Sequence, residues 1–192
     1  MGMTLVSDRV VKIVPLGLSD AGLMMALAGE LERTFPFSYR IGTDEKMPVD
    51  ALDGMRGQYH ATRILEHLVA SDRTAFRILG VTSFDIFTPI LQYIFGEAML
   101  GGRAALVSTY RLGTVPFEGV VPCRHAVFVD RVIKEGIHEL GHTFGLTHCD
   151  DHHCVMTASL TVGDIDEKST QMCYYCQMAF KDELARAGIA QS

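Results

Sequence analysis

The sequence predicts an α/β fold with a twisted, mixed β-sheet and flanking helices, and three observations lead to it. Short apolar runs rich in β-branched residues alternate with segments whose apolar residues recur at helical spacing. Two of the later strand candidates flank a Gly-Gly pair, which is a hairpin signal. The chain has 192 residues, 48% hydrophobic and 21% charged, as expected of one globular domain with a sizeable core.

The first predicted strand and helix lie near the N-terminus. Val10–Val14 is a short, mostly apolar and β-branched run, as expected of a strand that is covered on both faces. Ser19 then offers the side chain of a helix N-cap, and the predicted helix ends near Pro36. Its inward face consists of leucines at helical spacing: Leu23, Leu27 and Leu31.

A strand over Phe37–Ile41, a helix over Met55–Ala70 and a strand over Phe76–Thr82 are the next predicted elements. The helix is expected to turn four apolar or aromatic side chains inward: Met55, Tyr59, Leu65 and Leu68.

A hairpin and two helices complete the chain. The hairpin strands, Ile94–Met99 and Arg103–Thr109, flank Gly101 and Gly102. A helix over Val129–Phe144 carries the chemistry described next, and a last helix covers about Tyr174–Ala187. The first of these helices is expected to pack apolar residues against the sheet: Val129, Val132, Ile133, Leu140 and Phe144.

The segment from His138 to His148 has the pattern H-E-x-x-H-x-x-G-x-x-H, the extended signature of zinc proteases. Residues four apart share one face of a helix, so His138 and His142 can present both imidazoles to one metal ion. Gly145 can end the helix in a left-handed conformation, after which the chain can return with His148 as third ligand. Three protein ligands leave the fourth position of zinc to water, which is typical of a catalytic site.

Glu139 follows the first histidine and lies about 100° further around the helix axis. It therefore flanks the metal without binding it, close enough to accept a proton from a zinc-bound water. These residue types at this spacing predict metal-assisted hydrolysis with Glu139 as general base. The alternative is a buried helix whose histidines only pack.

Four further cysteines suit a closed, tetrahedral zinc site. They occur as two pairs, one of them C-x-x-C: Cys149 with Cys154, and Cys173 with Cys176. Two disulfides and four free thiols are the alternatives, and disulfides need an oxidising compartment. The fifth cysteine, Cys123, has no partner at useful spacing and is expected to be a small buried residue. Met156, soon after the third histidine, is expected to form the apolar floor beneath the ligands, known as the Met-turn.

The combined pattern H-E-x-x-H-x-x-G-x-x-H-C-x4-C-x-M, followed by C-x-x-C, resembles the archaemetzincins, a branch of the metzincin metalloproteases. The resemblance extends to Phe95–Ala98 and to Val107–Leu112, which are similar to the edge-strand region of that family. One local departure is the run Asp150-Asp151-His152-His153, which adds potential ligands after Cys149. The resemblance implies two Zn²⁺ per chain, a catalytic one on the three histidines and a structural one on the four cysteines.

The same resemblance implies a metzincin-like sheet in which Ile94–Met99 is an antiparallel edge strand above the cleft. It also implies an N-terminal subdomain, residues 1–145 with the active-site helix, and a small zinc-bound C-terminal subdomain, residues 146–192. An open edge can bind an extended peptide through main-chain hydrogen bonds. The alternative is a protected edge without a ligand.

The most direct functional prediction is a zinc-dependent metalloprotease that acts on peptides or proteins. Two alternatives stay open from the sequence: a zinc-stabilised peptide-binding or regulatory protein with little turnover, and an aminopeptidase. The net charge of −6 argues against nucleic acid and anionic membrane surfaces as partners. The first ten residues include Asp8 and Arg9 and lack a signal-like apolar run, so a cytoplasmic protein is expected. The sequence leaves the oligomeric state open.

Overall fold

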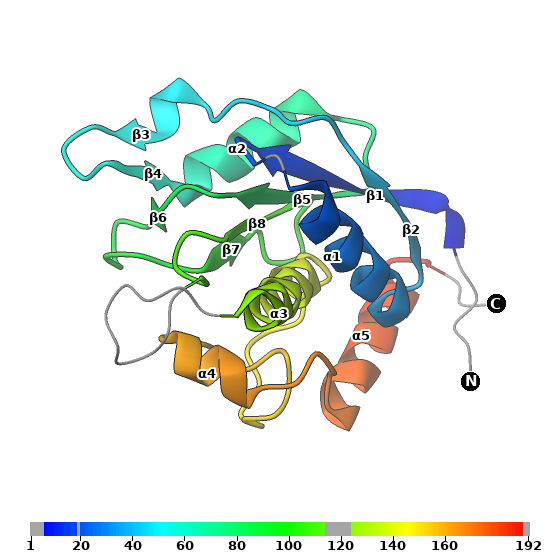
Figure 1. The fold of residues 1–192 in the computed structure, drawn as a ribbon. Coiled ribbons are helices and arrows are strands. Elements are labelled where there is room, and N and C mark those ends of the chain that lie inside the picture. The colour runs from blue at the N-terminus through cyan, green and yellow to red at the C-terminus, as the bar shows by residue number, and fades with distance from the viewer. Residues whose placement is uncertain (1–5, 19, 114–123, 190–192) are drawn as a thin grey trace.

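The computed structural model describes residues 6–18, 20–113 and 124–189 and shows one central sheet with helices on both faces (Figure 1). The five strands of this sheet lie in the order β2-β1-β5-β8-β7. All neighbouring pairs are parallel except β7 with β8, which is antiparallel and places β7 at the edge. The predicted α/β class and the antiparallel edge strand are thereby confirmed. The strands, in sheet order, are Phe37–Ile41, Val6–Leu16, Arg77–Thr82, Ala104–Ser108 and Gly96–Ala98.

The strands are apolar on both sides because helices cover both faces of the sheet. In β1, Val11 and Ile13 belong to a core with α1 and α3, whereas Val14 and Leu16 belong to a second core with α2. Figure 1 accordingly shows α2 on one side of the sheet and α1 and α3 on the other. The α-helices of the described residues, from α1 to α5, are Ala21–Thr34, Ala61–Ser71, His125–Thr143, Val162–Glu167 and Tyr174–Arg186.

The predicted helix over Met55–Ala70 is wrong in its first part, because the structure has a second, small sheet there. Strand β3 (Leu52–Asp53) turns back into β4 (Gln58–His60), which pairs in parallel with β6 (Ile86–Phe87). The turn forms because the Asp53 carboxylate accepts the main-chain N–H groups of Met55 and Arg56, at 2.9 and 3.1 Å. Met55 is therefore fully exposed instead of inward-facing, and the helix begins only at residue 61.

Three smaller differences concern the start of two helices and one helix that was not predicted. Ser19 lies outside the described residues, and α1 is capped by Asp20, whose carboxylate accepts the N–H of Leu23 at 2.9 Å. The active-site helix α3 begins four residues before the predicted start, at His125. The short helix α4 lies outside the predicted elements, and a capping box between Thr161 and Asp164 defines its start.

A cluster of aromatic rings fixes the end of α3 against the rest of the molecule. Phe144 follows α3 and stacks on Phe37 of β2 with 5.1 Å between ring centroids. Phe180 of α5 packs edge-on against Phe144 and Phe35, each at 5.3 Å. Aromatic pairs at these distances stabilise beyond the area they bury. The cluster therefore anchors both α5 and the segment that leaves the active-site helix, while the subdomain boundary at residues 145 and 146 stays a prediction.

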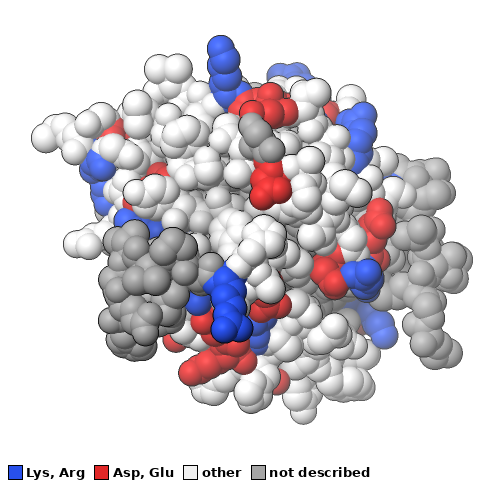
Figure 2. All heavy atoms as spheres, in the orientation of Figure 1, with Lys and Arg blue, Asp and Glu red and all other residues white. Residues whose placement is uncertain are grey.

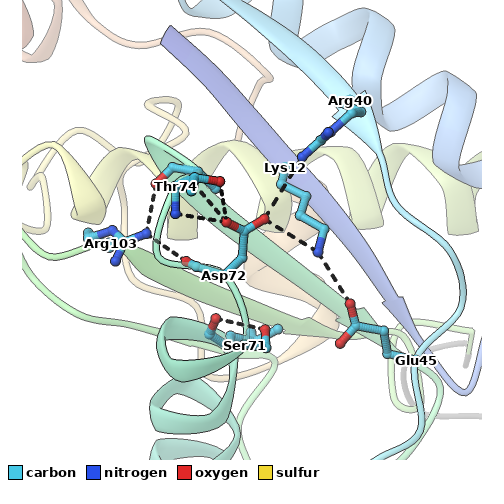
Figure 3. Close-up of polar contacts among 9 residues, drawn as sticks. Lys12, Arg40, Glu45, Ser71, Asp72, Thr74 and Arg103 are labelled. Carbon is cyan, nitrogen blue, oxygen red and sulfur yellow. Dashed lines mark hydrogen bonds and ion pairs between the residues drawn. The ribbon is translucent and has the colours of Figure 1, made fainter.

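Asp72, at the C-terminal end of α2, joins this helix to strands β1 and β2 (Figure 3). One carboxylate oxygen accepts hydrogen bonds from the hydroxyl and the N–H of Thr74 and from the N–H of Ala75, at 2.7, 2.9 and 3.0 Å. The other oxygen lies 3.6 Å from Lys12 Nζ of β1 and 3.9 Å from an Arg40 nitrogen of β2. The hydrogen bonds from Thr74 and Ala75, with the charge of Lys12, hold the pKa of Asp72 well below its usual range.

We expect Asp72→Asn to lower the free energy of unfolding by about 1–2 kcal/mol at pH 7, because charge-assisted hydrogen bonds and two ion pairs are lost. Since the folded pKa is depressed, the ionised carboxylate stabilises the fold above the unfolded pKa of about 3.9. The deficit of the variant should therefore shrink as the pH falls below about 4. Urea unfolding of both proteins from pH 7 to pH 3 checks this, with exposed Glu66→Gln of α2 as the control. A deficit that stays constant over this range would contradict the assignment.

Candidate metal centres

The first two histidines of the motif lie side by side on the buried face of α3. The Nε2 atoms of His138 and His142 are 3.1 Å apart. Each ring is fixed by its other nitrogen, since Nδ1 donates to a main-chain carbonyl, Val155 at 2.8 Å for His138 and Leu146 at 2.7 Å for His142. A carbonyl can only accept, so Nδ1 carries the hydrogen and Nε2 is left with a lone pair for a metal ion.

His148 reaches the same point because the chain reverses directly after α3. Gly145 has a φ of 88°, in the left-handed region, and its N–H donates to the carbonyl of His142 at 2.9 Å. The ring centroid of His148 then lies 5.3 Å from that of His138 and 4.9 Å from that of His142. The ligand atoms of all three histidines, here called the three-histidine site, lie within 4.8 Å of one another.

The donor set fits zinc. Tetrahedral Zn–N bonds of about 2.0–2.1 Å separate two ligand nitrogens by about 3.3 Å, close to the 3.1 Å between His138 and His142. Burial is the main cause that lowers the pKa of His138 well below its ordinary value, and nearby Lys168 and His142 add to it. Both effects favour neutral imidazole, which is the form that binds a metal.

Glu139 lies beneath the edge strand β7, against Gly96. A Cβ atom at position 96 would lie 2.5 Å from both Cγ and Oε1 of Glu139, so only glycine fits in β7 there. Glu139 is buried, and burial is the main cause that raises its pKa well above the ordinary value, with the charge of Glu135 adding to it. A carboxylate with a raised pKa accepts a proton more readily at neutral pH, as a general base requires.

A cavity of about 350 Å³, here called the cleft cavity, opens between β7, α3 and the segment after Met156. His138, Glu139 and His148 line it from below, and Gly96 lines it from the edge strand. Its remaining walls come from Glu135, from the segment before β7 and from Ala158–Leu160. The cavity therefore places any bound group against the histidines and Glu139 at once.

The four predicted cysteines form a second compact group, here called the four-cysteine site. Their sulfur atoms lie within 4.8 Å of one another, and those of Cys149 and Cys173 are 3.7 Å apart. A disulfide would require about 2.05 Å, and the cysteines are free thiols. Tetrahedral Zn–S bonds of about 2.3 Å separate two sulfurs by about 3.8 Å. The spacing therefore fits a closed zinc site and not two disulfides.

The two sites are joined through a short stretch of main chain. Cys149 follows His148 directly, and its N–H donates to the carbonyl of Met156 at 3.0 Å. Cys173 stands at the N-terminus of α5, where its N–H donates to Cys154 Sγ at 3.2 Å. Cys176 lies in the first turn of that helix. The four-cysteine site thus connects the third histidine with α5.

Met156 packs beneath α3, as the Met-turn prediction expects. Its side chain is fully buried, and a Cβ atom at position 141 would lie 2.6 Å from its sulfur. Gly141 therefore lets the methionine approach the helix backbone between the two helical histidines. The neighbouring Val155 carbonyl holds the His138 ring, so this turn both supports and orients a predicted ligand.

Sequence reasoning missed a buried ion pair next to this site. Lys168 Nζ lies 2.8 Å from Glu135 Oε1, and both side chains are buried. The same nitrogen donates to the carbonyl of Thr157 at 3.3 Å, so it joins α3 to the chain after the Met-turn. The two partners are far apart in sequence and neither belongs to a motif, so only the fold reveals the pair. Removing one partner of such a pair is costly because it leaves a buried charge.

The additional potential ligands after Cys149 do not join either group of metal-capable residues within the described part of the chain. Asp150 and His152 are exposed, and His153 directs Nδ1 to the carbonyl of Glu167 at 3.3 Å. Cys123 lies outside the described residues. In the described part of the chain, no helix has the length and apolar character needed to cross a membrane.

Comparison with known proteins shows a matching peptidase family and similar archaeal proteins. The family model described as Peptidase family M54 matches residues 6–182. An archaemetzincin of Haloquadratum walsbyi is 36% identical over 167 residues, which cover 86% of this chain and 96% of that protein. An archaemetzincin of Methanopyrus kandleri is 40% identical over 143 residues, covering 74% and 77%.

Solved structures agree. The crystal structure of the Methanopyrus kandleri archaemetzincin matches with a TM-score of 0.82 and 31% identity, covering 93% of this chain and 96% of that one. The crystal structure of the Archaeoglobus fulgidus archaemetzincin, complexed with malonate, matches with a TM-score of 0.77 and 32% identity, covering 88% and 99%.

Proposed function

The chain belongs to peptidase family M54, the archaemetzincins, and we propose that its three-histidine site hydrolyses peptide bonds of extended substrates held along β7. Membership makes the protein a zinc-dependent metallopeptidase that acts on peptides or proteins. The observation that carries the proposal is the position of Glu139, buried between the histidines and the edge strand at Gly96.

The open edge of β7 supports substrate binding by strand addition. The carbonyl of Phe95 accepts the N–H of Ser108 at 2.8 Å, and the N–H of Met99 donates to the carbonyl of Ala104 at 3.0 Å. Main-chain groups alternate in direction along a strand, so those of Gly96 and Ala98 point away from β8. An extended peptide can pair with them, and its backbone then passes over Glu139.

His138, His142 and His148 would hold the zinc ion through neutral imidazole nitrogens, with Val155 and Leu146 carbonyls keeping two rings in place. Bound there, zinc would lower the pKa of a coordinated water toward about 7 and polarise the scissile carbonyl. The Glu139 carboxylate accepts the proton of the attacking water and then delivers it to the leaving amine. Gly96 keeps this carboxylate covered, which excludes bulk water from the side of β7.

The four-cysteine site would hold a second, structural zinc ion, so the proposal includes two metal ions of different lability. Four thiolates close the coordination sphere, whereas three histidines leave one position open to exchange. Free cysteines persist in a reducing compartment, which supports a cytoplasmic protein.

Two observations weigh against the alternative functions. A protein that only binds peptides has no use for a base buried beside the metal ligands, yet Glu139 is held there at the cost of its desolvation. An aminopeptidase needs an acidic anchor for the free amine of its substrate. Glu135 is the other acidic residue lining the cleft cavity, and Lys168 already pairs with its carboxylate.

We expect the purified protein to contain two zinc ions per chain and to lose peptidase activity with the first of them. Mild chelation should remove the metal of the three-histidine site earlier, because its open position allows the chelator to attack. Metal analysis and hydrolysis of a fluorogenic peptide pool, followed through stepwise chelation and zinc addition, check this. One zinc per chain after zinc addition, or activity that survives loss of the first zinc, would count against the proposal.

A further inference from the structure

A second cavity of about 600 Å³ lies beside the cleft cavity, and no step of the proposed mechanism uses it. The two cavities share Gln92 and Tyr93 in their linings. Two arginines, Arg56 and Arg111, line the second cavity with one acidic residue, Asp85, and we call it the arginine-lined cavity. Glutamine, tyrosine and phenylalanine side chains complete most of the wall, so polar donors and aromatic surface occur together.

Arg111 is held rigidly in this wall. Its Nε and Nη2 donate to the two carboxylate oxygens of Asp85 at 2.8 and 2.6 Å, and its guanidinium lies 4.0 Å above the centre of the Tyr93 ring. Asp85 is only 10% exposed and also accepts the amide of Gln58 at 2.8 Å. The hydrogen bonds to Asp85 raise the pKa of Arg111, so this side chain is always cationic.

Arg56 is fixed from the other side. Its Nε donates to Gln58 Oε1 and its Nη2 to the carbonyl of Gln92, both at 3.0 Å. Its guanidinium also lies 3.9 Å above the centre of the Phe87 ring. Both guanidinium groups are therefore ordered before any ligand arrives, which reduces the entropy lost on binding.

The charges in the lining favour an anion. With two arginines and one aspartate, the titratable charges of the lining sum to a positive value, in a protein whose net charge is −6. Figure 2 shows Lys and Arg side chains at the left edge of this face, over the small sheet to which β3 and β4 belong. Nε and Nη2 of both arginines already donate within the wall, whereas Nη1 of Arg56 has no hydrogen-bond partner among the described residues and can donate to a carboxylate.

The arginine-lined cavity lies on the path of a bound substrate. Tyr93, three residues before Gly96, joins the two cavities: its hydroxyl donates to the carbonyl of Leu160 at 3.3 Å, in the wall of the cleft cavity. A peptide that pairs antiparallel with β7 runs from Ala98 toward Gly96. Beyond Gly96 the edge is closed, because the N–H of Ile94 donates to the carbonyl of Ile86 in β6 at 3.1 Å. The part of the substrate after the scissile bond therefore leaves the edge at this point. Gln92 and Tyr93, which line both cavities, lead from there to the arginines, about two or three residues further on at about 3.3 Å per residue.

We propose that the arginine-lined cavity is a substrate subsite that selects a carboxylate two or three residues after the scissile bond. The carboxylate is that of an acidic side chain or of the free C-terminus of a short peptide. This inference rests on the proposed function for the position of the scissile bond, whereas the recognition of the carboxylate rests on Arg56, with the positive charge of Arg111 beside it.

The test uses one peptide sequence, blocked at its N-terminus and amidated at its C-terminus, with Glu, Gln or Lys at each of the three positions after the cleaved bond. A fourth peptide ends in a free carboxylate at the third of these positions. Cleavage is followed with the zinc-loaded protein. Binding of the same peptides is followed by fluorescence anisotropy with zinc-loaded Glu139→Gln, so that recognition is measured even without turnover.

We expect the wild type to prefer Glu over Gln by about tenfold in kcat/KM at one of these positions, and to disfavour Lys. Arg56→Gln should lose most of this preference, and Arg56→Glu should shift it toward Lys. The control, Arg33→Gln on α1, removes an exposed arginine whose ion pair is with its helix neighbour Glu30, and it should keep the full preference. Arg111→Gln is a second variant, to be interpreted only where its thermal unfolding matches the wild type.

The outcomes separate this inference from the function on which it rests. Equal cleavage and equal binding of the Glu, Gln and Lys peptides would overturn the subsite. A preference that Arg56→Glu leaves unchanged would overturn the role of the arginine. Binding that favours Glu without any cleavage would uphold the subsite and count against the proposed function. If the peptides are neither cleaved nor selectively bound, both the subsite and the proposed function are rejected.

Discussion

Replacing Glu139 by alanine is expected to lower kcat/KM for peptide hydrolysis by at least about 10²–10⁴-fold, while both metal ions stay bound. General-base catalysis contributes about that factor, and the loss of water positioning adds to it. Metal binding should survive because Glu139 is not one of the grouped metal-capable residues: the grouped nitrogens belong to His138, His142 and His148. Removing a buried carboxylate also removes its desolvation cost, so the variant should stay folded.

A second variant separates the base from the ligands. His142→Ala removes one of the two imidazoles on the buried face of α3, and its own ring contacts with His138 and His148 disappear with it. We expect this variant to lose the more labile zinc and its activity together. Paired measurements of activity and metal content distinguish the two variants. Wild-type turnover by Glu139→Ala on any peptide that the native protein cleaves would show that the proposed mechanism is wrong.

Local sequence was enough to predict that the three histidines lie together, because they belong to one helix and the turn that follows it. A four-residue spacing on one helix brings His138 and His142 together whatever the rest of the fold does. Gly145, with its positive φ, then allows the chain reversal that brings His148 back to the other two histidines. The grouping of the two cysteine pairs into one site is harder to predict, because nearly twenty residues separate Cys154 from Cys173. Only the metal-binding chemistry of four thiolates indicates this grouping.

The parts that could not be predicted depend on contacts between distant segments. Nothing in the sequence joins Lys168 to Glu135, or Arg111 to Asp85, because each pair forms only after the sheet and α3 are in place. The importance of Gly96 is also invisible locally, since it follows from the approach of Glu139 beneath β7.

The error at Met55 has a different cause. The sequence contains a turn signal in Asp53-Gly54 and Gly57, but its apolar residues at helical spacing favour a helix that continues across this signal. The Asp53 side chain offers the backbone an alternative to the helix by accepting two of its N–H groups, and this local hydrogen bonding prevailed.

Replacing Cys176 by serine is expected to damage folding and not catalysis alone. A structural zinc site contributes its binding free energy to folding, and a site with three thiolates holds the ion far less firmly. A loss of about 3–5 kcal/mol would lower Tm by roughly 6–20 °C for a chain of this size. The effect should spread beyond the metal, because Cys176 lies one turn before Phe180, which packs on Phe35 and Phe144.

Thermal unfolding and metal analysis of Cys176→Ser check this expectation, with Cys123→Ser as the matched control. Cys123 lies outside the described residues and belongs to neither predicted ligand set, so its variant should keep two zinc ions. The position of α5 links the result to catalysis: the four-cysteine site joins it to Cys149, the residue after His148. Loss of the structural metal should therefore release the third histidine and weaken the catalytic site as well. A Cys176→Ser protein that melts within about one degree of the wild type and retains both metals would refute the structural role of this site.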